Sequence, residues 1–390
     1  MSPADLATPA LLVDRDRLAR NLDRMQSLAD ATDVTLRPHA KTHKSVALAR
    51  RQQERGAEGL TVATVREAET FVEAGIEDVR VAFPVTGRDK HARLQSLRDD
   101  ADLSFTVDTA AGAEQAAAVY PEDDPIDVVM EVDVGHGRCG VPWDHGEAAI
   151  HLARRIAELP SLRLAGILTH AGQAYDGPTG DETEDEALRR VAQAERDRML
   201  HVAARLAHSR QLSGPGVEPG TFDVSIGSTP SISAFENAER DGFQITEIRP
   251  GNYVMHDAMQ VALGAASLDD CALTVLTTVV STQRTADGTQ RAFVDAGKKV
   301  FTTDTGYGTD GYGVVLADAA TRTPLADVRL DHLSEEHGWL EVPSSSTLTV
   351  GDRLHIVPNH ACVTVANHSA LHLVEGEAVV DTWSVDATGW

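Results

Sequence analysis

The sequence predicts an α/β fold in which a TIM-like (β/α)8 barrel is followed by a C-terminal all-β domain. In the first part, about eight short apolar runs alternate with helix-length segments over roughly 250 residues. Beyond about residue 265, strand-like runs follow one another with glycine-rich turns between them. We therefore expect the barrel over residues 8–262 and the β domain over residues 263–390, which residues 1–7 can join.

The strands are expected where short runs are rich in β-branched and other apolar residues. For the barrel, these runs are 10–13, 34–38, 59–63, 79–83, 103–107, 126–133, 164–169, 221–226 and a last one ending at Arg249. The β domain has such runs at 271–280, 290–295 and 353–358. Helices are expected at 16–30, 44–55 and 64–74. A doubly wound open sheet is the alternative, but no Gly-x-Gly-x-x-Gly motif follows the first strand, and the number of units favours a closed barrel.

Composition excludes several classes of protein. The 60 acidic residues outnumber 35 basic ones, and the net charge of −25 repels nucleic acids and anionic lipids. No apolar run is long enough to cross a membrane, and Met1–Thr8 lacks the pattern of a secretory signal. Three cysteines cannot form a disulfide framework, so a cytoplasmic enzyme is expected. The acid excess is also typical of a halophilic protein, with an ordinary acidic enzyme as the alternative.

Catalytic groups of such barrels gather where the strands end. One expected strand end carries Lys41, inside the octapeptide Arg37–Lys44 and between His39 and His43. A lysine buried beside cationic or histidine neighbours is nucleophilic, as Schiff-base formation requires. The alternative is a lysine in a surface salt bridge. The chain has only five lysines, and two of them stand in this octapeptide.

Two further strand ends suit a phosphate group. The segment Gly227–Pro230 has small residues, hydroxyl groups and free backbone amides, and Arg249–Tyr253 ends the next strand in a similar way. Either segment alone is more typical of a plain turn. Together, on consecutive strand ends, they predict a phosphate site divided between two loops.

A glycine-rich turn after another strand projects Arg138 within the segment Asp133–Gly140. A guanidinium keeps its proton and is a fixed donor to a cofactor oxygen. The alternative is a structural arginine that pairs with Asp133.

A possible metal pair stands in the β domain, where His360 and Cys362 follow a strand. Residues two apart on an extended segment face the same side, so both side chains could bind one ion. Nitrogen with sulfur ligation suits zinc. A structural zinc site usually has four ligands, and a buried free cysteine is the alternative.

Taken in order, these segments resemble the family of D-serine dehydratases and metal-dependent D-threonine aldolases. Those are fold-type III pyridoxal 5′-phosphate (PLP) enzymes with an alanine-racemase-like barrel and a β domain. The resemblance covers nearly the whole chain. It is carried by residues 8–14, 37–44, 61–64, 67–69, 133–140, 227–230, 249–253 and 358–362.

The resemblance implies a role for each candidate residue. Lys41 would be the Schiff-base lysine, and Arg138 would contact the phenolic oxygen of PLP. The other cofactor-binding candidates are Ser228, Thr229, Gly251 and Asn252 at the phosphate, Arg249 at the pyridine nitrogen, and Tyr175. His360 and Cys362 would bind Zn2+, with Mn2+ or another divalent ion as alternatives. The family also implies a homodimer in which the β domain of one subunit closes the barrel of the other.

The family divides by reaction. Its aldolases more often have aspartate where Cys362 stands, and the strand end at 169–175 resembles the dehydratases. We therefore expect a PLP- and zinc-dependent lyase of D-3-hydroxyamino acids, a D-serine dehydratase that yields pyruvate and ammonia, with Lys41 as base. The alternative is a D-threonine aldolase that forms glycine and acetaldehyde, with His170 as base. A racemase needs no metal, and non-catalytic PLP-carrying relatives have only a barrel, so both are less favoured.

Overall fold

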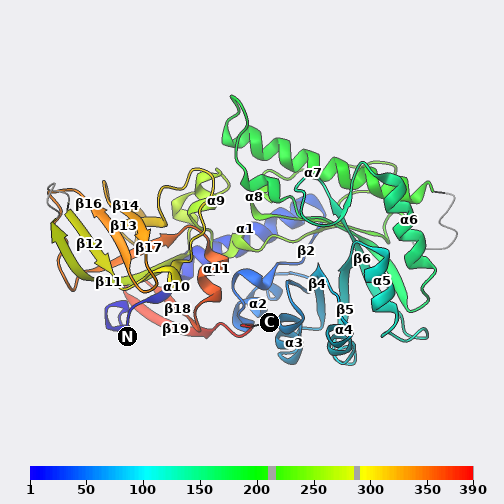
Figure 1. The fold of residues 1–390 in the computed structure, drawn as a ribbon, viewed down its shortest axis with the longest axis horizontal. Helices are drawn as coiled ribbons and strands as arrows, with labels where there is room; N and C mark the ends of the chain where they lie inside the picture. The colour runs from blue at the N-terminus through cyan, green and yellow to red at the C-terminus, as the bar shows by residue number, and fades with distance from the viewer. Residues whose placement is uncertain (210–216, 285–289, 390) are drawn as a thin grey trace. The chain divides into compact units, whose positions relative to one another are not determined.

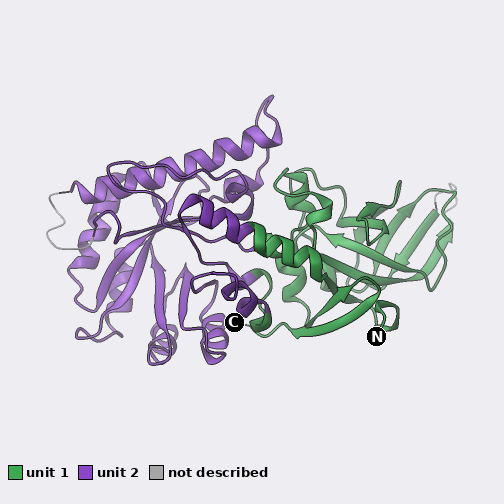
Figure 2. Ribbon diagram, turned by 180° about the vertical axis from the view of Figure 1, so that it is seen from behind, with its two compact units in different colours: residues 1–24, 42–47, 252–386 green, residues 25–41, 48–251, 387–390 purple. Residues whose placement is uncertain are grey.

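The structure is a computed structural model that describes residues 1–209, 217–284 and 290–389. Figure 1 shows the fold as a ribbon, and Figure 2 colours its two compact units. Unit 1 comprises residues 1–24, 42–47 and 252–386, and unit 2 comprises residues 25–41, 48–251 and 387–390. Each unit contains one sheet system and is described by itself. No helix in the described part of the chain is long and apolar enough to cross a membrane.

Unit 2 is built on a parallel sheet of eight main strands that follow one another around the sheet in chain order. The strands are β2 (Thr35–Leu36), β3 (Leu60–Val62), β4 (Asp78–Pro84), β5 (Asp102–Val107), β6 (Ile126–Asp133), β8 (Leu162–Leu168), β9 (Asp223–Ile226) and β10 (Glu247–Ile248). A short strand, β7 (Val141–Pro142), pairs with β6. An isolated bridge between His39 and Thr61 joins the two edge strands, β2 and β3. The predicted eight-stranded α/β fold is thus confirmed.

Helices alternate with these strands. For three of the helices, the residue that precedes the first turn explains where the helix begins. The helices are α2 (Val46–Gln53), α3 (Val65–Glu73), α4 (Arg88–Gln95), α5 (Ala110–Ala117), α6 (Gly146–Ala157), α7 (Glu184–Ala207) and α8 (Thr229–Ile232). Thr64, Thr109 and Thr183 precede α3, α5 and α7, and each hydroxyl accepts a backbone N–H three residues on. Such N-caps satisfy donors that the helix itself leaves unpaired.

The strand predicted at residues 10–13 exists, but the prediction that it belongs to the barrel was wrong. Strand β1 (Ala10–Asp14) belongs to unit 1, where it pairs antiparallel with β11 and parallel with β18. Helix α1 (Arg15–Thr32) follows it. A short apolar run is equally suited to either sheet, and its partners here lie more than 250 residues away in the sequence, so the local pattern cannot choose between them.

Unit 1 contains the ten-stranded sheet system of the predicted β domain. Its other strands are β11 (Leu273–Arg284), β12 (Gln290–Val294), β13 (Gly313–Asp318), β14 (Thr323–Pro324), β15 (Arg329–Leu333), β16 (Gly338–Val342), β17 (Arg353–Pro358), β18 (Ala370–Glu375) and β19 (Ala378–Ser384). The unit is mostly β rather than all β. It also contains the short helices α9 (Ala258–Ala262), α10 (Lys298–Phe301) and α11 (Ala361–Ala366). The domain limits 8–262 and 263–390 stay a prediction.

Candidate active site

Lys41 lies at the C-terminal end of β2, in a 3-10 turn over Ala40–Thr42, and is half-buried. The residues before it are fixed by both neighbouring strand ends. His39 bridges to Thr61, and its backbone N–H donates to the carbonyl of Pro250 over 3.0 Å. Lys41 therefore stands at the strand-end position where the barrel fold gathers reactive groups.

His170 follows β8 and lies close to three positively charged residues of the predicted site. Burial lowers the pKa of His170 well below its usual value, and the charges of Lys41, Arg138 and Arg249 lower it further. Its Nδ1 lies 3.1 Å from the carbonyl oxygen of Gly227. Because a carbonyl can only accept, Nδ1 carries the proton and Nε2 keeps its lone pair. His170 is thus a neutral ring with a lone pair on Nε2, and the same burial and charges make it a weaker base than a free histidine.

Two aromatic rings lie beside His170. The ring of His136 meets it edge-on, with centroids 5.8 Å apart, and the ring of Tyr175 lies at 6.5 Å. The structure thus brings Tyr175 together with His170, Lys41 and Arg138 in unit 2. Its predicted contact with the cofactor stays a prediction.

Arg138 does not form the ion pair with Asp133 that was the alternative to a role at the cofactor. Asp133 accepts the backbone N–H groups of residues 135–137 over 2.8–3.1 Å, and so shapes the turn instead of pairing with the arginine. Arg138 lies 3.6 Å from Glu131 and is half-exposed. Burial raises the pKa of Glu131 despite the opposing charges of Arg138 and Arg249. The sequence offered no reason to prefer Glu131, which belongs to the interior-facing part of β6.

Arg249 is only 4% exposed and is held by polar groups of two other strands. Its Nε donates to the hydroxyl of Ser225 over 2.7 Å, and another nitrogen donates to the carbonyl of Thr169. Burial lowers the pKa of Arg249 to about 10, so the guanidinium still keeps its proton at neutral pH. The residue is a buried cation of fixed orientation, as a partner for a cofactor ring atom would be.

Arg249 is connected through Ser225 to a buried network of charged side chains. Ser225 donates to Glu247 over 2.6 Å, and Glu247 pairs with Arg80 at 2.7 Å and with Arg37 at 2.5 Å. Burial alone would raise the pKa of Glu247, but the two arginines outweigh it and lower the pKa to about 2. Glu247 is therefore a permanent carboxylate in the barrel interior.

The segment Gly227–Thr229 has features that fit a phosphate group. Gly227 has φ +155°, and a Cβ there would stand 2.8 Å from the backbone nitrogen of Arg249, so a side chain would not fit. The hydroxyl of Thr229 is buried and has no hydrogen-bond partner within the described chain. Buried hydroxyls are almost always paired, so an unpaired one indicates a missing acceptor such as a phosphate oxygen. Ser228 caps α8 and lies 2.9 Å from Ser231.

Sequence reasoning missed Glu195, a fully buried residue of α7 behind this segment. One of its oxygens accepts the backbone N–H of Gly227 over 3.1 Å, and the other accepts the hydroxyl of Ser231 over 2.7 Å. Burial raises the pKa of Glu195 to about 7 despite these hydrogen bonds. A signal existed, because Glu195 stands between Val191 and Met199 at the four-residue spacing of the buried face of α7.

The second predicted phosphate loop is divided between the two units. Gly251 is buried at the end of β10 in unit 2. Asn252 begins a 3-10 turn of unit 1, where its side-chain amide donates to Asp257 over 2.5 Å. The Asn252 side chain is therefore held by Asp257, and a phosphate contact of this residue stays a prediction.

His360 and Cys362 meet in unit 1, although the premise of an extended segment was wrong. His360 is the N-cap of α11, and Cys362 lies in the first turn of that helix. Burial lowers the pKa of His360, but Cys362, Asp257 and Asp304 outweigh it and raise the pKa to about 10. The thiol of Cys362 lies 3.1 Å from the hydroxyl of Thr42. A histidine beside a thiol, surrounded by groups that attract positive charge, fits a divalent cation.

The described residues contain no group of three or more histidine, cysteine, aspartate or glutamate side chains arranged to hold a metal ion. The predicted donor set of His360 and Cys362 would therefore be a set of two side chains. Such a set leaves the remaining coordination positions to water or substrate, as catalytic metal sites do.

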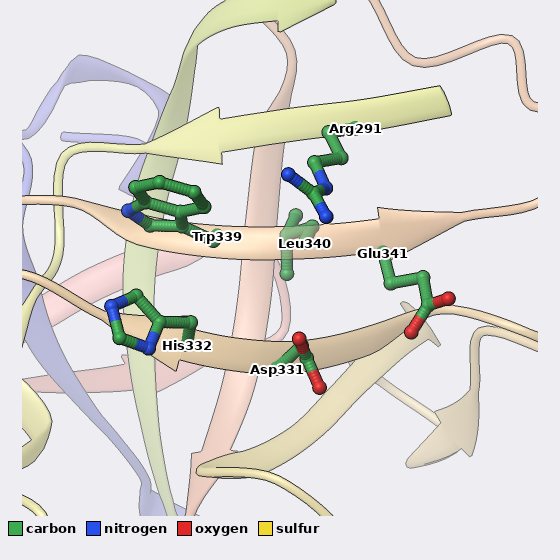
Figure 3. Close-up of a pocket in the computed structure, with 6 residues that line it drawn as sticks. All are labelled: Arg291, Asp331, His332, Trp339, Leu340 and Glu341. Atoms are coloured by element: carbon green, nitrogen blue, oxygen red, sulfur yellow. The ribbon is translucent and has the colours of Figure 1, made fainter. Parts of the chain in front are cut away.

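Unit 1 also has a hollow of about 320 Å3 that none of the predicted site residues lines (Figure 3). It is lined by Arg291, Asp331, His332, Trp339, Leu340 and Glu341. Trp339 meets His332 edge-on at 5.1 Å, and Arg329 pairs with both Asp331 and Glu341. Both carboxylates of this surface thus already pair with an arginine of the same sheet.

Two family models match the chain in succession. The model described as alanine racemase, N-terminal domain, matches residues 13–257, and the putative serine dehydratase domain matches residues 272–374. The chain belongs to the alanine-racemase-like family of PLP-dependent lyases. The predicted family and enzyme class are therefore confirmed.

Members of this family with full-length similarity include dehydratases and aldolases. The D-threo-3-hydroxyaspartate dehydratase of Delftia sp. (strain HT23) is 36% identical, with 97% of each chain covered. The D-threonine aldolase of Arthrobacter sp. is 33% identical, covering 99% of this chain and 94% of the relative. The D-serine dehydratase of Dictyostelium discoideum is 25% identical, covering 96% and 94%. The solved structure of the Delftia enzyme matches with a TM-score of 0.86 and 34% identity over 100% of both chains.

Two solved variants of a D-threo-3-hydroxyaspartate dehydratase match with a TM-score of 0.87 and 34% identity. One carries a histidine-to-alanine change and covers 100% of this chain and 97% of its own, and the other carries a cysteine-to-alanine change and covers 100% of both. The cysteine variant is described as a metal-free form. The two replaced residues stand two positions apart, the same spacing as His360 and Cys362 here.

Proposed function

We propose that this family member is a PLP- and divalent-metal-dependent dehydratase of D-3-hydroxyamino acids, with zinc as the metal. The observation that carries the proposal is the pair His360 and Cys362, with the Cys362 thiol 3.1 Å from Thr42, the residue that follows Lys41 in the sequence. The metal-free cysteine variant of the related dehydratase supports the same assignment. D-serine and D-threo-3-hydroxyaspartate are the two candidate substrates, and both share the D-amino group and the β-hydroxyl.

Several features of unit 2 support PLP as the cofactor. Lys41 would hold it, and the unpaired hydroxyl of Thr229 with the segment around Ser228 would hold its phosphate. PLP supplies an electron sink for the negative charge that forms at Cα. Arg249 is fixed by Ser225 and Thr169, so it can orient the cofactor ring without moving. Arg138 would supply a second positive charge.

Different residues of the site are proposed to act at Cα and at the β-hydroxyl of the substrate. We assign the amine of Lys41 as the base that takes the proton from Cα of the substrate. Burial and Lys41 keep the pKa of His170 far below its usual value, so His170 cannot donate a proton to a leaving hydroxyl at neutral pH. His360 and Cys362 would hold the metal, which would supply Lewis acidity toward the β-hydroxyl. We therefore expect dehydration to depend strictly on the metal.

A second candidate function is D-threonine aldolase. The tautomer of His170 favours it, because the bond from Nδ1 to Gly227 leaves Nε2 able to accept the proton of the β-hydroxyl. That transfer is what cleavage of the Cα–Cβ bond needs. The similarity of this chain to the Arthrobacter D-threonine aldolase also supports this second candidate.

The proposal is tested with purified protein that has been loaded with PLP and Zn2+. D-serine and D-threo-3-hydroxyaspartate are assayed for release of an oxo acid and ammonia, and D-threonine is assayed for glycine and acetaldehyde. We expect oxo acid release that a chelator abolishes and Zn2+ or Mn2+ restores. Release of glycine without any oxo acid would instead make the protein an aldolase.

The cofactor assignment is tested by spectroscopy. Lys41→Ala should lose the visible absorbance band of lysine-bound PLP, because no other residue is proposed to hold the cofactor covalently. Lys90→Ala, which removes an exposed lysine of α4, is the matched control and should keep the band. A band that persists in Lys41→Ala would refute the assignment.

A further inference from the structure

We infer that Asp304 is a positioning residue of the metal site, which selects the nitrogen of His360 that is free to bind the ion. Asp304 lies in the loop between α10 and β13, more than 50 residues before His360 in the sequence. The inference rests on the proposed function, because it assumes that His360 and Cys362 hold the metal. It concerns how the protein prepares the histidine for that task.

The contact between the two side chains decides the tautomer. Oδ2 of Asp304 lies 2.8 Å from Nδ1 of His360. An ionised carboxylate can only accept a hydrogen bond, so Nδ1 carries the proton when the ring is neutral. The lone pair is then on Nε2, and this nitrogen is the one available to a cation. A histidine ligand in proteins usually has its other nitrogen fixed in this way.

The backbone around Asp304 is fixed by the residue next to His360. Asn359 is 3% exposed, and its side-chain amide donates to the carbonyl of Asp304 over 3.0 Å and to the carbonyl of Gly311 over 2.9 Å. Two consecutive residues, Asn359 and His360, thus bond the main chain and the side chain of Asp304. This double attachment keeps the carboxylate in register with the ring.

A second acid fixes the other side of the pair. Asp257 is fully buried and accepts the backbone N–H of Ala361, between His360 and Cys362, over 2.8 Å. Asp257 also caps α9 through the N–H of Gln260. Asp257 therefore holds the backbone of the pair, whereas Asp304 holds the His360 ring. The two carboxylates have separate tasks.

The geometry favours orientation over direct ligation by Asp304. Its near oxygen is engaged with Nδ1, so Nε2 is the ring nitrogen that remains for the ion. In addition, the described side chains do not form a metal-binding group of three that would include Asp304. A carboxylate in this place raises the electron density on the ring and lowers its rotational freedom, and both effects strengthen binding through Nε2.

The test measures the affinity of the PLP-loaded protein for Zn2+ by competition with a chromogenic chelator. Asp304→Ala removes the acceptor, and we expect binding to weaken about 10- to 100-fold. Asp304→Asn keeps an oxygen that can accept from Nδ1, so it should retain most of the affinity. Asp310→Asn is the matched control, because it removes an acid of the same loop that pairs only at the surface, with Arg329 at 3.1 Å.

Co2+ provides a second measurement that does not depend on turnover. The charge-transfer band between Co2+ and the Cys362 thiolate should change in Asp304→Ala and stay unchanged in Asp310→Asn. Thermal unfolding checks that each variant is folded. Asp304→Ser, which also removes the carboxylate, replaces the alanine variant if that variant does not fold.

The outcomes are distinct for the two proposals. A wild-type protein that binds no Zn2+ would end the metal assignment itself. Normal wild-type binding with an Asp304→Ala affinity within about twofold of it would overturn the role of Asp304. Equal and large losses in Asp304→Ala and Asp304→Asn would indicate that the charge binds the ion directly, and would also overturn the positioning role.

Discussion

At the scale of single residues, two buried glutamates show how neighbours decide ionisation. Glu247 lies between Arg80 and Arg37, and its pKa falls to about 2 although burial opposes this. Glu195 accepts hydrogen bonds and is affected by the charge of Arg249, but burial outweighs these effects and raises its pKa to about 7. The same residue type is therefore a permanent anion in one place and a titrating group in the other.

The protonation of Glu195 predicts a pH-dependent stability. Its folded pKa of about 7 lies above the usual 4.5, so its contribution is complete below about pH 4.5 and is lost as the pH rises through 7. Glu195→Gln mimics the protonated form at every pH. We expect this variant to be more stable than the wild type by about 1–3 kcal/mol above pH 7 and to lose this advantage toward pH 5, measured by thermal unfolding.

The control for this prediction is Asp197→Asn on the same helix. Asp197 is exposed and pairs with Arg196 at 2.8 Å, so its replacement should change stability little at any pH. Parallel pH profiles for the wild type and Glu195→Gln would show that Glu195 does not titrate in the folded protein.

At the scale of elements, the turn after β6 illustrates how a short segment presents one side chain. Asp133 bonds the backbone of residues 135–137, and Gly140 returns the chain against the strand with φ +105°. A Cβ at Gly140 would stand 2.7 Å from the backbone nitrogen of Asp133. The turn can therefore close, and present Arg138, only if residue 140 has no side chain.

Two glycine substitutions test this explanation. Gly140→Ala should destabilise the protein by more than about 2 kcal/mol, because it adds a backbone clash to the cost of a left-handed conformation. Gly137→Ala is the control, since its φ is +75° and a Cβ there meets nothing within 4 Å. That variant should lose only about 1 kcal/mol. Urea unfolding measures both, and equal losses would contradict the packing argument at Gly140.

At the scale of the whole molecule, the charge excess predicts a response to salt. The chain has a net charge of −25, and like charges on the surface repel one another unless ions screen them. Raising KCl from about 0.1 M to about 2 M should therefore increase the melting temperature. The same series with sucrose, which stabilises without screening charge, separates the two effects. A melting temperature that is independent of KCl would refute the prediction that the protein is salt-adapted.

The predicted homodimer also belongs to this scale and stays a prediction. Sedimentation or light scattering of the PLP-loaded protein at several concentrations measures the oligomeric state directly.

The sequence by itself predicted the fold class, which the structure confirms, and several candidate site residues, which stay predictions. Alternating apolar runs predicted the eight-stranded α/β unit, and the change of pattern near residue 265 predicted the β domain. Lys41, Arg138 and the pair at 360–362 were identified because they stand beside strand ends or turns. Periodicity and turn chemistry act over a few residues, so such features are legible in a single sequence.

Tertiary structure alone decided which distant groups meet. It placed β1 in the sheet of unit 1 and brought Glu195 of α7 to Gly227. These contacts join residues on different strands and helices, and their energies depend on burial and on the surrounding charges. No local pattern contains that information.

The same distinction applies to the predicted metal pair. The sequence identified His360 and Cys362 but placed them on an extended segment, whereas the chain turns into α11 after His360. The orientation of the His360 ring depends on Asp304, which lies more than 50 residues earlier. The identity of a ligand is thus a local property of the chain, but the direction in which it points is set by a contact that only folding creates.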